Sequence, residues 1–283
     1  MSPAGIERTV VVGGGMAAAG AIEALRSGDY AGRLMLVGAE PVPPYERPPL
    51  SKGYLLETTA EERLFPRPES FYAEQSVELR LGVAATRLDV ATRTVSLADG
   101  SSVGYDRLLI ATGGEVVPLH VPGAELSGIY YLRTLEDARA LARALRSPST
   151  AGGRVVIVGA GFIGAEVAAA CRALGLDVTI VEILPAPLVR ALGVEVGEHF
   201  AAVHRAHGVD LRLREGVAAF AGAGRVEEVV TTSGVRIPCG CVVVGVGMRP
   251  VTGWLEGSGV ALGDGILVNE FCQTSVPGVY AAG

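Results

Sequence analysis

The chain has 283 residues, of which 49% are hydrophobic and 39 are glycine, and its formal net charge is −6 at pH 7. This length and apolar content suit a well-buried α/β protein of about two domains. The negative charge, without a basic cluster, argues against a nucleic-acid partner. No apolar run approaches the roughly 18 residues that span a bilayer. We therefore expect a cytoplasmic protein without a membrane partner.

The four cysteines and four histidines are spread along the chain without the spacing of a metal site. Cys239 and Cys241 alternate with apolar residues, so we expect both to be ordinary strand residues. A C-x-C redox pair is the alternative interpretation. We predict no metal centre.

The first predicted element is a buried strand, Arg8–Val12, that runs into glycines and then into a helix. In such a motif the first glycine makes a tight turn, and the second lets the backbone approach a pyrophosphate. The third lets helix and strand pack closely. Gly13 and Gly15 hold the first two positions and Ala18 the third. The pattern predicts a dinucleotide-binding turn.

A proline-rich segment, residues 41–52, follows the next predicted strand. Its prolines are incompatible with a helix interior or a central strand, so we expect an ordered loop leading into a short helix. The loop follows the carboxyl end of a strand, where ligands bind in open α/β sheets. A rigid surface connection with solvated Arg47 and Lys52 is the alternative.

Short alternating segments fill residues 77–110 and predict a small β meander followed by a return to the main sheet. The returning strand ends at Thr112 and Gly113, again at the ligand edge. Farther on, Thr134 to Asp137 resembles a capping box at a helix start, and residues 147–153 have the composition of a linker.

A second glycine turn follows the strand that begins at Arg154, with Gly159, Gly161 and Gly164 at the three positions. A further helix is expected over residues 194–207. It contains three histidines, which we interpret as part of a polar helix face: His199, His204 and His207. A second set of β segments, residues 209–246, and a final strand-like run, residues 265–283, complete the chain.

Each glycine turn is followed by a strand that leads to an acid. Glu182 lies 182 − 159 = 23 residues after its first glycine, close to the spacing of about 20 at which a carboxylate meets ribose hydroxyls. Glu40 lies 40 − 13 = 27 residues on, and we expect the first helix to be lengthened through Gly28 and Gly32. Two unrelated α/β turns are the alternative, but the duplication favours two dinucleotide sites.

The order of these motifs resembles the FAD-dependent ferredoxin reductases, which include putidaredoxin reductase and the reductase components of ring-hydroxylating dioxygenases. The motifs cover essentially the whole chain: two G-x-G-x-x-G/A turns, Pro-Pro-Leu-Ser-Lys, Ala-Thr-Gly, Leu-Arg-Thr-Leu-Glu-Asp, Val-Gly-Val-Gly and Thr-Ser-Val-Pro-Gly-Val-Tyr-Ala-Ala-Gly. The resemblance implies the pyridine nucleotide-disulfide oxidoreductase fold, with two Rossmann-like three-layer α/β domains and small β meanders. The NAD-binding domain, 119–244, would be inserted between two parts of the FAD-binding domain, 1–118 and 245–283.

The resemblance also implies that the first turn holds FAD and the second NADH. The positions implied around FAD are Gly13, Gly15, Ala17, Ala18, Glu40, Arg47, Lys52, Ala85, Thr112, Gly113 and Arg133. Those implied around NADH are Gly159, Gly161, Phe162, Ile163, Gly164, Glu182, Arg190 and Gly247. In some relatives the ribose-binding acid stands at the place of Ala39. The segment Gly114-Glu-Val-Val departs from the Ala-x-Pro-Arg of many relatives, which leaves the role of that turn open.

The family's activity implies that hydride passes from NADH to the flavin, and that single electrons then pass to an iron–sulfur ferredoxin serving a P450 or an oxygenase. Disulfide reductases of the same superfold carry a C-x4-C pair soon after the first turn, and thiol peroxidases or oxidases a single Cys. Residues 40–52 contain no cysteine, so we expect electrons to leave the flavin directly. An NADH oxidase or diaphorase, and a non-catalytic redox-sensing module, are the alternatives.

Three charged residues, Lys52, Glu166 and Glu182, are expected to act on the cofactors. The resemblance puts the Ser51–Lys52 pair of the proline-rich loop and Glu166 on opposite sides of the flavin N5 region, where the cation stabilises the reduced flavin and the carboxylate orients the cation. A plainer interpretation of Glu166 is an acid in the first turns of a helix, worth about 0.3–1 kcal/mol. Glu182 would repel the extra phosphate of NADPH, so we predict a preference for NADH, which Arg190 could soften.

In the resembling family the Tyr-Ala-Ala-Gly motif is followed by an Asp that binds FAD, then by the rest of the FAD domain and a third domain. This sequence stops at Gly283. We therefore expect a truncated reductase that holds FAD weakly and has little ferredoxin-reducing activity, because an incomplete sheet exposes an edge and apolar surface. The NAD-binding part should suffer least.

Overall fold

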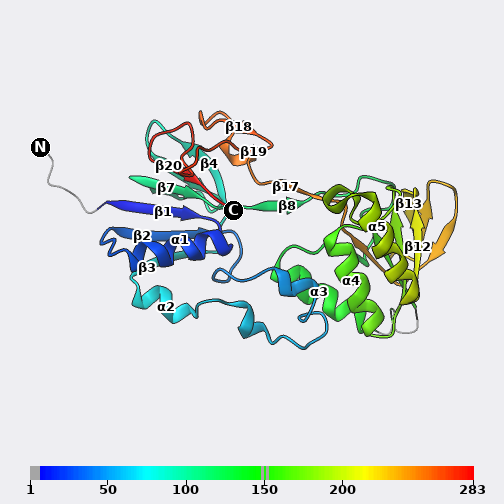
Figure 1. Cartoon of the computed structure of the whole chain (residues 1–283). Coiled ribbons are helices and arrows are strands. Elements are labelled where there is room, and N and C mark those ends of the chain that lie inside the picture. The colour runs from blue at the N-terminus through cyan, green and yellow to red at the C-terminus, as the bar shows by residue number, and fades with distance from the viewer. Residues whose placement is uncertain (1–6, 148–149, 151–152) are drawn as a thin grey trace, which may run out of the picture. The chain divides into compact units, whose positions relative to one another are not determined.

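The computed structural model describes residues 7–147, 150 and 153–283. The chain divides into two compact units (Figure 1). Unit 1 comprises Met1–Glu46, Glu62–Glu115 and Arg249–Gly283, and unit 2 comprises Arg47–Glu61 and Val116–Met248. Unit 2 is thus built from two segments that interrupt unit 1 in the sequence. The predicted linker, residues 147–153, lies largely outside the described residues.

Unit 1 is built on a five-stranded parallel sheet with the strand order β20-β7-β1-β2-β3. Its strands are β1 (Arg8–Val12), β2 (Arg33–Gly38), β3 (Val77–Leu81), β7 (Arg107–Ile110) and β20 (Val279–Ala281). Each inner strand begins with an arginine and contains a run of Val, Leu, Ile or Met, the composition expected where both faces of a parallel sheet are covered. The covering elements are α1 (Met16–Ser27), α2 (Glu69–Glu74), β4 (Ala85–Asp89), β5 (Thr94–Leu97) and β6 (Ser102–Gly104).

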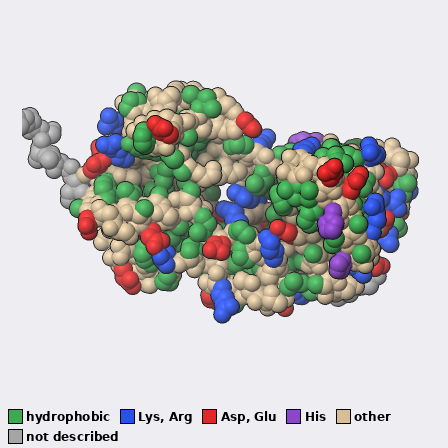
Figure 2. Space-filling model, in the orientation of Figure 1, with side chains coloured by type: hydrophobic (Ala, Val, Ile, Leu, Met, Phe, Trp, Pro, Cys, Tyr) green, Lys and Arg blue, Asp and Glu red, His purple; other side chains and the backbone are tan. Residues whose placement is uncertain are grey.

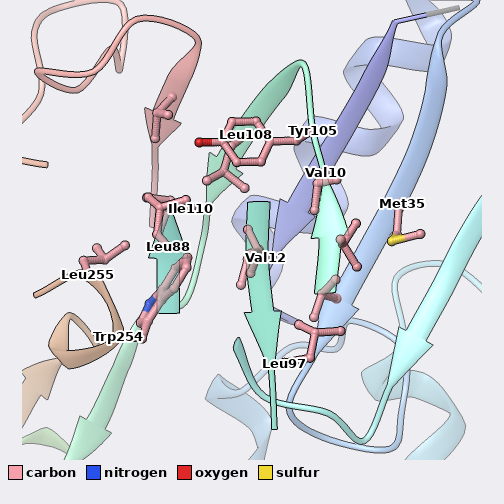
Figure 3. Packing of buried hydrophobic residues seen from close by; sticks show 14 of the residues in the cluster. Val10, Val12, Met35, Leu88, Leu97, Tyr105, Leu108, Ile110, Trp254 and Leu255 are labelled. Atoms are coloured by element: carbon pink, nitrogen blue, oxygen red, sulfur yellow. The ribbon is translucent and has the colours of Figure 1, made fainter. Parts of the chain in front are cut away.

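Alternate residues of the sheet in unit 1 point to different layers. Val11 packs with Ile22 of α1 and Tyr72 of α2. Val10 and Val12 pack instead in the cluster that holds the antiparallel β4-β5-β6 meander. Figure 3 shows this second cluster, in which strand residues meet the meander and the 3-10 turn η3 (Gly253–Leu255). The unit therefore has three layers: helices, parallel sheet and meander.

Unit 2 repeats this plan with a five-stranded parallel sheet of order β12-β11-β10-β16-β9. The strands are β9 (Ile129–Tyr130), β10 (Arg154–Val158), β11 (Asp177–Glu182), β12 (Val209–Leu213) and β16 (Cys241–Val244). The helices are α3 (Leu135–Leu145), α4 (Phe162–Ala173) and α5 (Val189–Ala206), and the antiparallel meander is β13 (Val217–Ala221), β14 (Glu228–Thr231) and β15 (Arg236–Pro238). The predicted fold class, α/β with two Rossmann-like domains and small β meanders, is confirmed.

Shorter elements complete the chain. They are η1 (Pro48–Ser51), η2 (Glu61–Leu64), the paired strands β8 (Gly114–Val116) and β17 (Met248–Pro250), and the hairpin β18 (Leu262–Gly263) and β19 (Gly265–Ile266). The predicted short helix in the proline-rich loop is η1, a single 3-10 turn. The predicted capping box at α3 is present, because Thr134 Oγ1 accepts from the Asp137 N–H at 3.1 Å and the Asp137 carboxylate accepts from the Thr134 N–H at 2.8 Å.

Three details differ from the prediction. Residues 77–81 do not open the meander, because β3 pairs in parallel with β2 as the edge of the main sheet. The helix α1 is not lengthened: it ends at Ser27, with Gly28 as its C-cap. The histidines do not share one exposed face, since His204 is buried while His199 and His207 are exposed.

On the face shown in Figure 2, acidic and basic side chains are interspersed. None of the helices in the described ranges has the length and apolar composition required to cross a bilayer.

Candidate functional site

The glycine turn of unit 1 lies at the carboxyl end of its sheet. Gly13 has φ +130°, and a Cβ added there would lie 2.0 Å from the Ala111 carbonyl oxygen. A side chain is therefore excluded both by the backbone conformation and by the end of β7. Thr112 follows directly, and its hydroxyl donates to the Val251 carbonyl oxygen at 3.0 Å. The neighbouring Gly113 carbonyl accepts from the Val251 N–H at 3.0 Å.

The start of α1 has the features of an anion site. Gly15 is its N-cap, no side chain caps it, and its first turn contains no acid. A Cβ added at Gly15 would meet nothing within 4 Å. The unpaired N–H groups of a helix start and the helix dipole favour a phosphate group. Ala17 and Ala18 lie in this first turn, so the residues present fit a dinucleotide diphosphate.

The glycine turn of unit 2 has the same construction. Gly159 has φ +98°, and an added Cβ would lie 2.4 Å from the Gly245 carbonyl oxygen. Gly161 is the N-cap of α4, again without a side-chain cap, and faces open space. Gly164 packs on the turn itself, since its Cβ would lie 2.0 Å from the Gly159 carbonyl oxygen. This turn also fits a diphosphate.

The two acids that follow the turns are held in different ways. Glu182, the last residue of β11, is 8% exposed, and its carboxylate accepts from the Ala160 N–H at 2.6 Å and the Leu184 N–H at 2.8 Å. It is thereby tied to its own glycine turn, and each oxygen keeps a second lone pair for a ribose hydroxyl. Glu40 lies two residues beyond β2 and accepts from the Tyr45 hydroxyl at 2.6 Å. Ala85 lies in β4 of the meander.

A pocket of about 510 Å³ opens in unit 2 beside its glycine turn. Predicted site residues that line it are Arg47, Lys52, Arg133, Gly161, Phe162, Ile163, Glu166 and Gly247. The positions assigned to the flavin surroundings in the proline-rich loop thus share one pocket with the second glycine turn. Arg47 also donates to the Arg133 carbonyl oxygen at 2.6 Å, which links the two arginine positions. Arg190 is exposed and does not line this pocket.

Residues outside the predicted site set also line the pocket, among them Ser51, Val116 and Met248. Phe162 and Met248 are 55% and 57% exposed, which is high for large apolar side chains. Convergent polar groups beside an apolar wall are typical of a small-molecule site. Their sequence neighbours could have indicated Ser51 and Met248 as lining residues, since Ser51 precedes Lys52 and Met248 follows Gly247.

The polar wall of the pocket is a direct contact between the proline-rich loop and α4. Lys52 Nζ lies 2.8 Å from Glu166 Oε2, and Ser51 Oγ lies 2.5 Å from the same oxygen. Glu166 is the fifth residue of α4 and therefore lies beyond its first turn, which contains no acid. Its carboxylate is bound by the side chains of Ser51 and Lys52. Lysine and carboxylate are in contact, closer than an arrangement on opposite sides of a flavin would suggest.

The three buried cysteines, Cys171, Cys239 and Cys241, are poor candidates for redox chemistry. Burial raises the pKa of Cys171 and of Cys239 to about 12, and burial also raises the pKa of Cys241. These thiols are therefore protonated at neutral pH, and a protonated thiol is a poor nucleophile. Within the described ranges, no group of three or more His, Cys, Asp or Glu side chains is placed to hold a metal ion.

Comparison with known proteins connects these features to a family. The sequence model of the pyridine nucleotide-disulphide oxidoreductases matches residues 7–283. Over 275 residues, or 97% of the chain, the sequence is 40% identical to rhodocoxin reductase of Rhodococcus erythropolis and 41% identical to a ferredoxin–NAD(P)(+) reductase of Sphingomonas sp. The chain spans 64% and 66% of the lengths of these two relatives.

The crystal structure of the covalent putidaredoxin reductase–putidaredoxin complex is similar to this fold with a TM-score of 0.93 and 34% identity. It covers 98% of this chain, which in turn covers 67% of the matched chain.

Proposed function

The chain belongs to the pyridine nucleotide-disulphide oxidoreductase family, and from this premise we propose that it is a flavoprotein that passes hydride from NADH to FAD. Single electrons would then pass to an iron–sulfur ferredoxin that serves a P450 or an oxygenase. The printed name of the Sphingomonas relative, ferredoxin–NAD(P)(+) reductase, supports this activity.

Unit 1 is the proposed FAD-binding part and unit 2 the proposed NADH-binding part. The predicted domain boundaries at 118/119 and 244/245 lie close to the unit boundaries at 115/116 and 248/249. Residues 47–61 belong to unit 2, although the prediction included them in the FAD-binding domain. The proline-rich loop would then carry Lys52 to the pocket that receives the nicotinamide.

The observation that carries the proposal is the pocket of unit 2. It joins the start of α4, where a nucleotide diphosphate would bind, to the Lys52–Glu166 pair and to an exposed apolar wall. FAD, when bound, supplies the conversion of one hydride into two single electrons. The protein's own groups would bind and orient the two nucleotides and exclude water from the site. Lys52 is the residue that would stabilise negative charge on the reduced flavin, and Glu166 holds its ammonium.

The preference for NADH over NADPH belongs to the same proposal. Glu182 is buried and carries its charge at the end of β11, bound to two main-chain N–H groups. A phosphate on the ribose would meet this carboxylate at close range with like charge. The exposed Arg190 is the candidate for partial compensation. A cytoplasmic location, as the sequence predicts, completes the proposal.

The experiment is rapid mixing of the FAD-loaded chain with NADH, with and without a ferredoxin. Reduction of the bound flavin by NADH, followed by electron transfer to the ferredoxin, is the expected result, and the weak FAD binding expected from the sequence should keep the turnover low. Oxygen consumption alone would identify an NADH oxidase or diaphorase. Stable reduced flavin without turnover would identify a redox-sensing module, and an absence of flavin reduction would contradict the proposal.

A further inference from the structure

The sequence contains a single lysine. The other 23 of its 24 Lys and Arg residues are arginine, so the chain uses the guanidinium group at every other basic position. The one ammonium is Lys52, in the wall of the unit 2 pocket. An ammonium is a compact charge with three tetrahedral donors, whereas a guanidinium is a planar fork. The exception indicates that position 52 requires the shape of an ammonium as well as its charge.

The contacts of Lys52 explain this requirement. Its Nζ lies 2.8 Å from Glu166 Oε2 and 3.1 Å from the Pro48 carbonyl oxygen. Among the described residues, these acceptors use two of its three N–H bonds, which leaves one for the pocket. The side chain of Lys52 is nevertheless 51% exposed. A long, half-exposed side chain loses considerable rotamer entropy when it is held in one place. Holding Lys52 in one place therefore requires that its acceptor, the Glu166 carboxylate, is itself fixed.

Ser51 supplies that constraint. It is the last residue of η1, it is 1% exposed, and its Oγ lies 2.5 Å from Glu166 Oε2. A serine hydroxyl has one proton to donate. The alternative acceptor, the Pro48 carbonyl oxygen, is 3.5 Å away, so the proton belongs to the carboxylate. One oxygen of Glu166 therefore accepts from two consecutive residues of the proline-rich loop.

The two donors differ in mobility. Ser51 is buried and has a single short χ angle, whereas Lys52 reaches the same oxygen through four carbons. The carboxylate is itself only 27% exposed, on a helix that packs against η1. The Ser51 hydroxyl thus fixes the direction of the Glu166 side chain, and Glu166 then fixes the lysine.

We propose that Ser51 is a positioning residue that aims the Lys52 ammonium into the pocket through Glu166. The effect of this orientation of Lys52 on flavin reduction rests on the proposed function. The orientation itself depends only on residues of unit 2. A charge that is displaced by about 1 Å from its working position can cost about 100-fold in rate. The Ser51→Ala variant should therefore weaken the reaction while the Lys52 ammonium itself is retained.

The test uses the single lysine as its own probe. The full chain is labelled with ¹³C and ¹⁵N in lysine, which gives one side-chain signal, and its order parameter is measured by NMR relaxation. Ser51→Ala and the nearly isosteric Ser51→Cys should lower the Lys52 side-chain order parameter clearly below its wild-type value. The matched control is Ser258→Ala in unit 1, which removes another buried hydroxyl, 6% exposed. An unchanged Lys52 order parameter in folded Ser51 variants would overturn the proposal.

A second measurement separates this inference from the proposed function. In the FAD-loaded chain, Ser51→Ala should slow flavin reduction by about 10- to 100-fold while the Kd for NADH changes less than about twofold. If wild type is reduced by NADH and the variant is reduced equally fast, the positioning role is wrong and the proposed function stands. If wild type is not reduced, the proposed function fails, and the lysine signal still decides whether Ser51 holds Lys52.

Discussion

The two units of this protein have the same topology but differ in local chemistry. Their sheets match strand for strand, β20-β7-β1-β2-β3 against β9-β16-β10-β11-β12, and each is covered by a three-stranded meander. The helices that follow the glycine turns, α1 and α4, are both 12 residues long. The next helices differ: α2 has 6 residues, whereas α5 spans 18 residues with a kink at Gly193, whose backbone is not helical. The shared plan places the turns, while the residues around them decide what each turn binds.

The spacing of the acids shows how the difference arises. Glu40 and Glu182 lie 27 and 23 residues after their first glycines, although α1 and α4 have equal lengths. Two of the four extra residues lie in the connection after the helix, which has five residues (28–32) in unit 1 and three (174–176) in unit 2. The other two lie beyond the strand, because β2 ends at Gly38 whereas β11 ends at its acid.

An arginine occurs at the same place in both units, 13 residues after the first glycine (26 − 13 and 172 − 159). Arg26 donates to the carbonyl oxygens of Tyr30 at 2.6 Å and Gln75 at 2.8 Å, and Arg172 to those of Leu176 at 2.7 Å and His207 at 2.9 Å. Each arginine joins the end of its helix to the segment that enters the third strand. The repetition indicates a structural role for these arginines, separate from nucleotide binding.

The largest expected effect concerns the third position of the glycine turns. Gly164→Ala should lower the free energy of unfolding by about 3 kcal/mol, because its Cβ would lie 2.0 Å from the Gly159 carbonyl oxygen and the backbone must move. Unit 1 already accommodates a methyl group there, in buried Ala18. Ala18→Gly should cost only about 1 kcal/mol, from helix propensity. Urea denaturation of both variants is the check, and equal losses would remove this difference between the units.

The arginines should come next. Arg26→Met should cost about 2 kcal/mol and Arg172→Met about 1 kcal/mol, since charged hydrogen bonds to carbonyl groups are lost in both. The larger loss is expected at Arg26, which also donates to the carbonyl oxygens of Gly32 at 3.0 Å and Ser76 at 3.2 Å. Thermal unfolding of the two variants measures the order. A larger loss for Arg172→Met would show that these hydrogen bonds do not set the stability.

Cofactor selection should separate the two acids. Glu182→Gln should raise kcat/KM for NADPH relative to NADH by about tenfold, or about 1.4 kcal/mol, because it removes the like charge from the ribose site. Glu40→Gln, the matched change in unit 1, should leave this ratio unchanged. Steady-state kinetics with both nucleotides decides the point. An unchanged ratio in Glu182→Gln would place the discrimination elsewhere.

The smallest expected effect is a pH dependence confined to unit 2. Burial, and to a lesser degree the charge of His207, lowers the pKa of His204 from its ordinary value of 6.5. Below that pH the unfolded chain binds a proton that the folded chain does not, so stability falls as pH decreases through 6.5. His204→Gln should flatten this dependence, whereas the exposed His199→Gln should not. Denaturation midpoints at pH 5 to 8 test this, and parallel curves for wild type and His204→Gln would refute it.

Features governed by neighbouring residues could be predicted from the sequence. The glycine turns, the strands before them and the capping box at Thr134 depend on patterns a few residues long. Features that depend on distant pairing could not. The segment 77–81 alternates like a meander strand, yet it pairs with β2. The burial of His204 depends on packing that a helical pattern with three histidines does not reveal.

The candidate site also combines features that local patterns predict with contacts between residues far apart in the sequence. Lys52 and Glu166 were singled out by the resemblance, and Ser51 belongs to the same Pro-Pro-Leu-Ser-Lys motif. The contact between Lys52 and Glu166, however, joins residues 114 positions apart, and no local pattern predicts that Ser51 donates to the same carboxylate. The same long-range packing assigns residues 47–61 to unit 2. Sequence motifs therefore predicted which residues share the pocket more readily than the contacts among them.

The central claim is that each glycine turn binds its own nucleotide, FAD in unit 1 and NADH in unit 2. Gly15 and Gly161 offer a direct test, because a Cβ at either position meets nothing within 4 Å and should leave the fold intact while filling the space for a diphosphate. Titration of FAD and NADH into Gly15→Val and Gly161→Val should show two opposite losses. We expect Gly15→Val to weaken FAD by at least about 100-fold and Gly161→Val to weaken NADH equally, each about 2.8 kcal/mol, with the other Kd changed less than about twofold. Loss of both nucleotides from either variant, or of neither, would contradict the account.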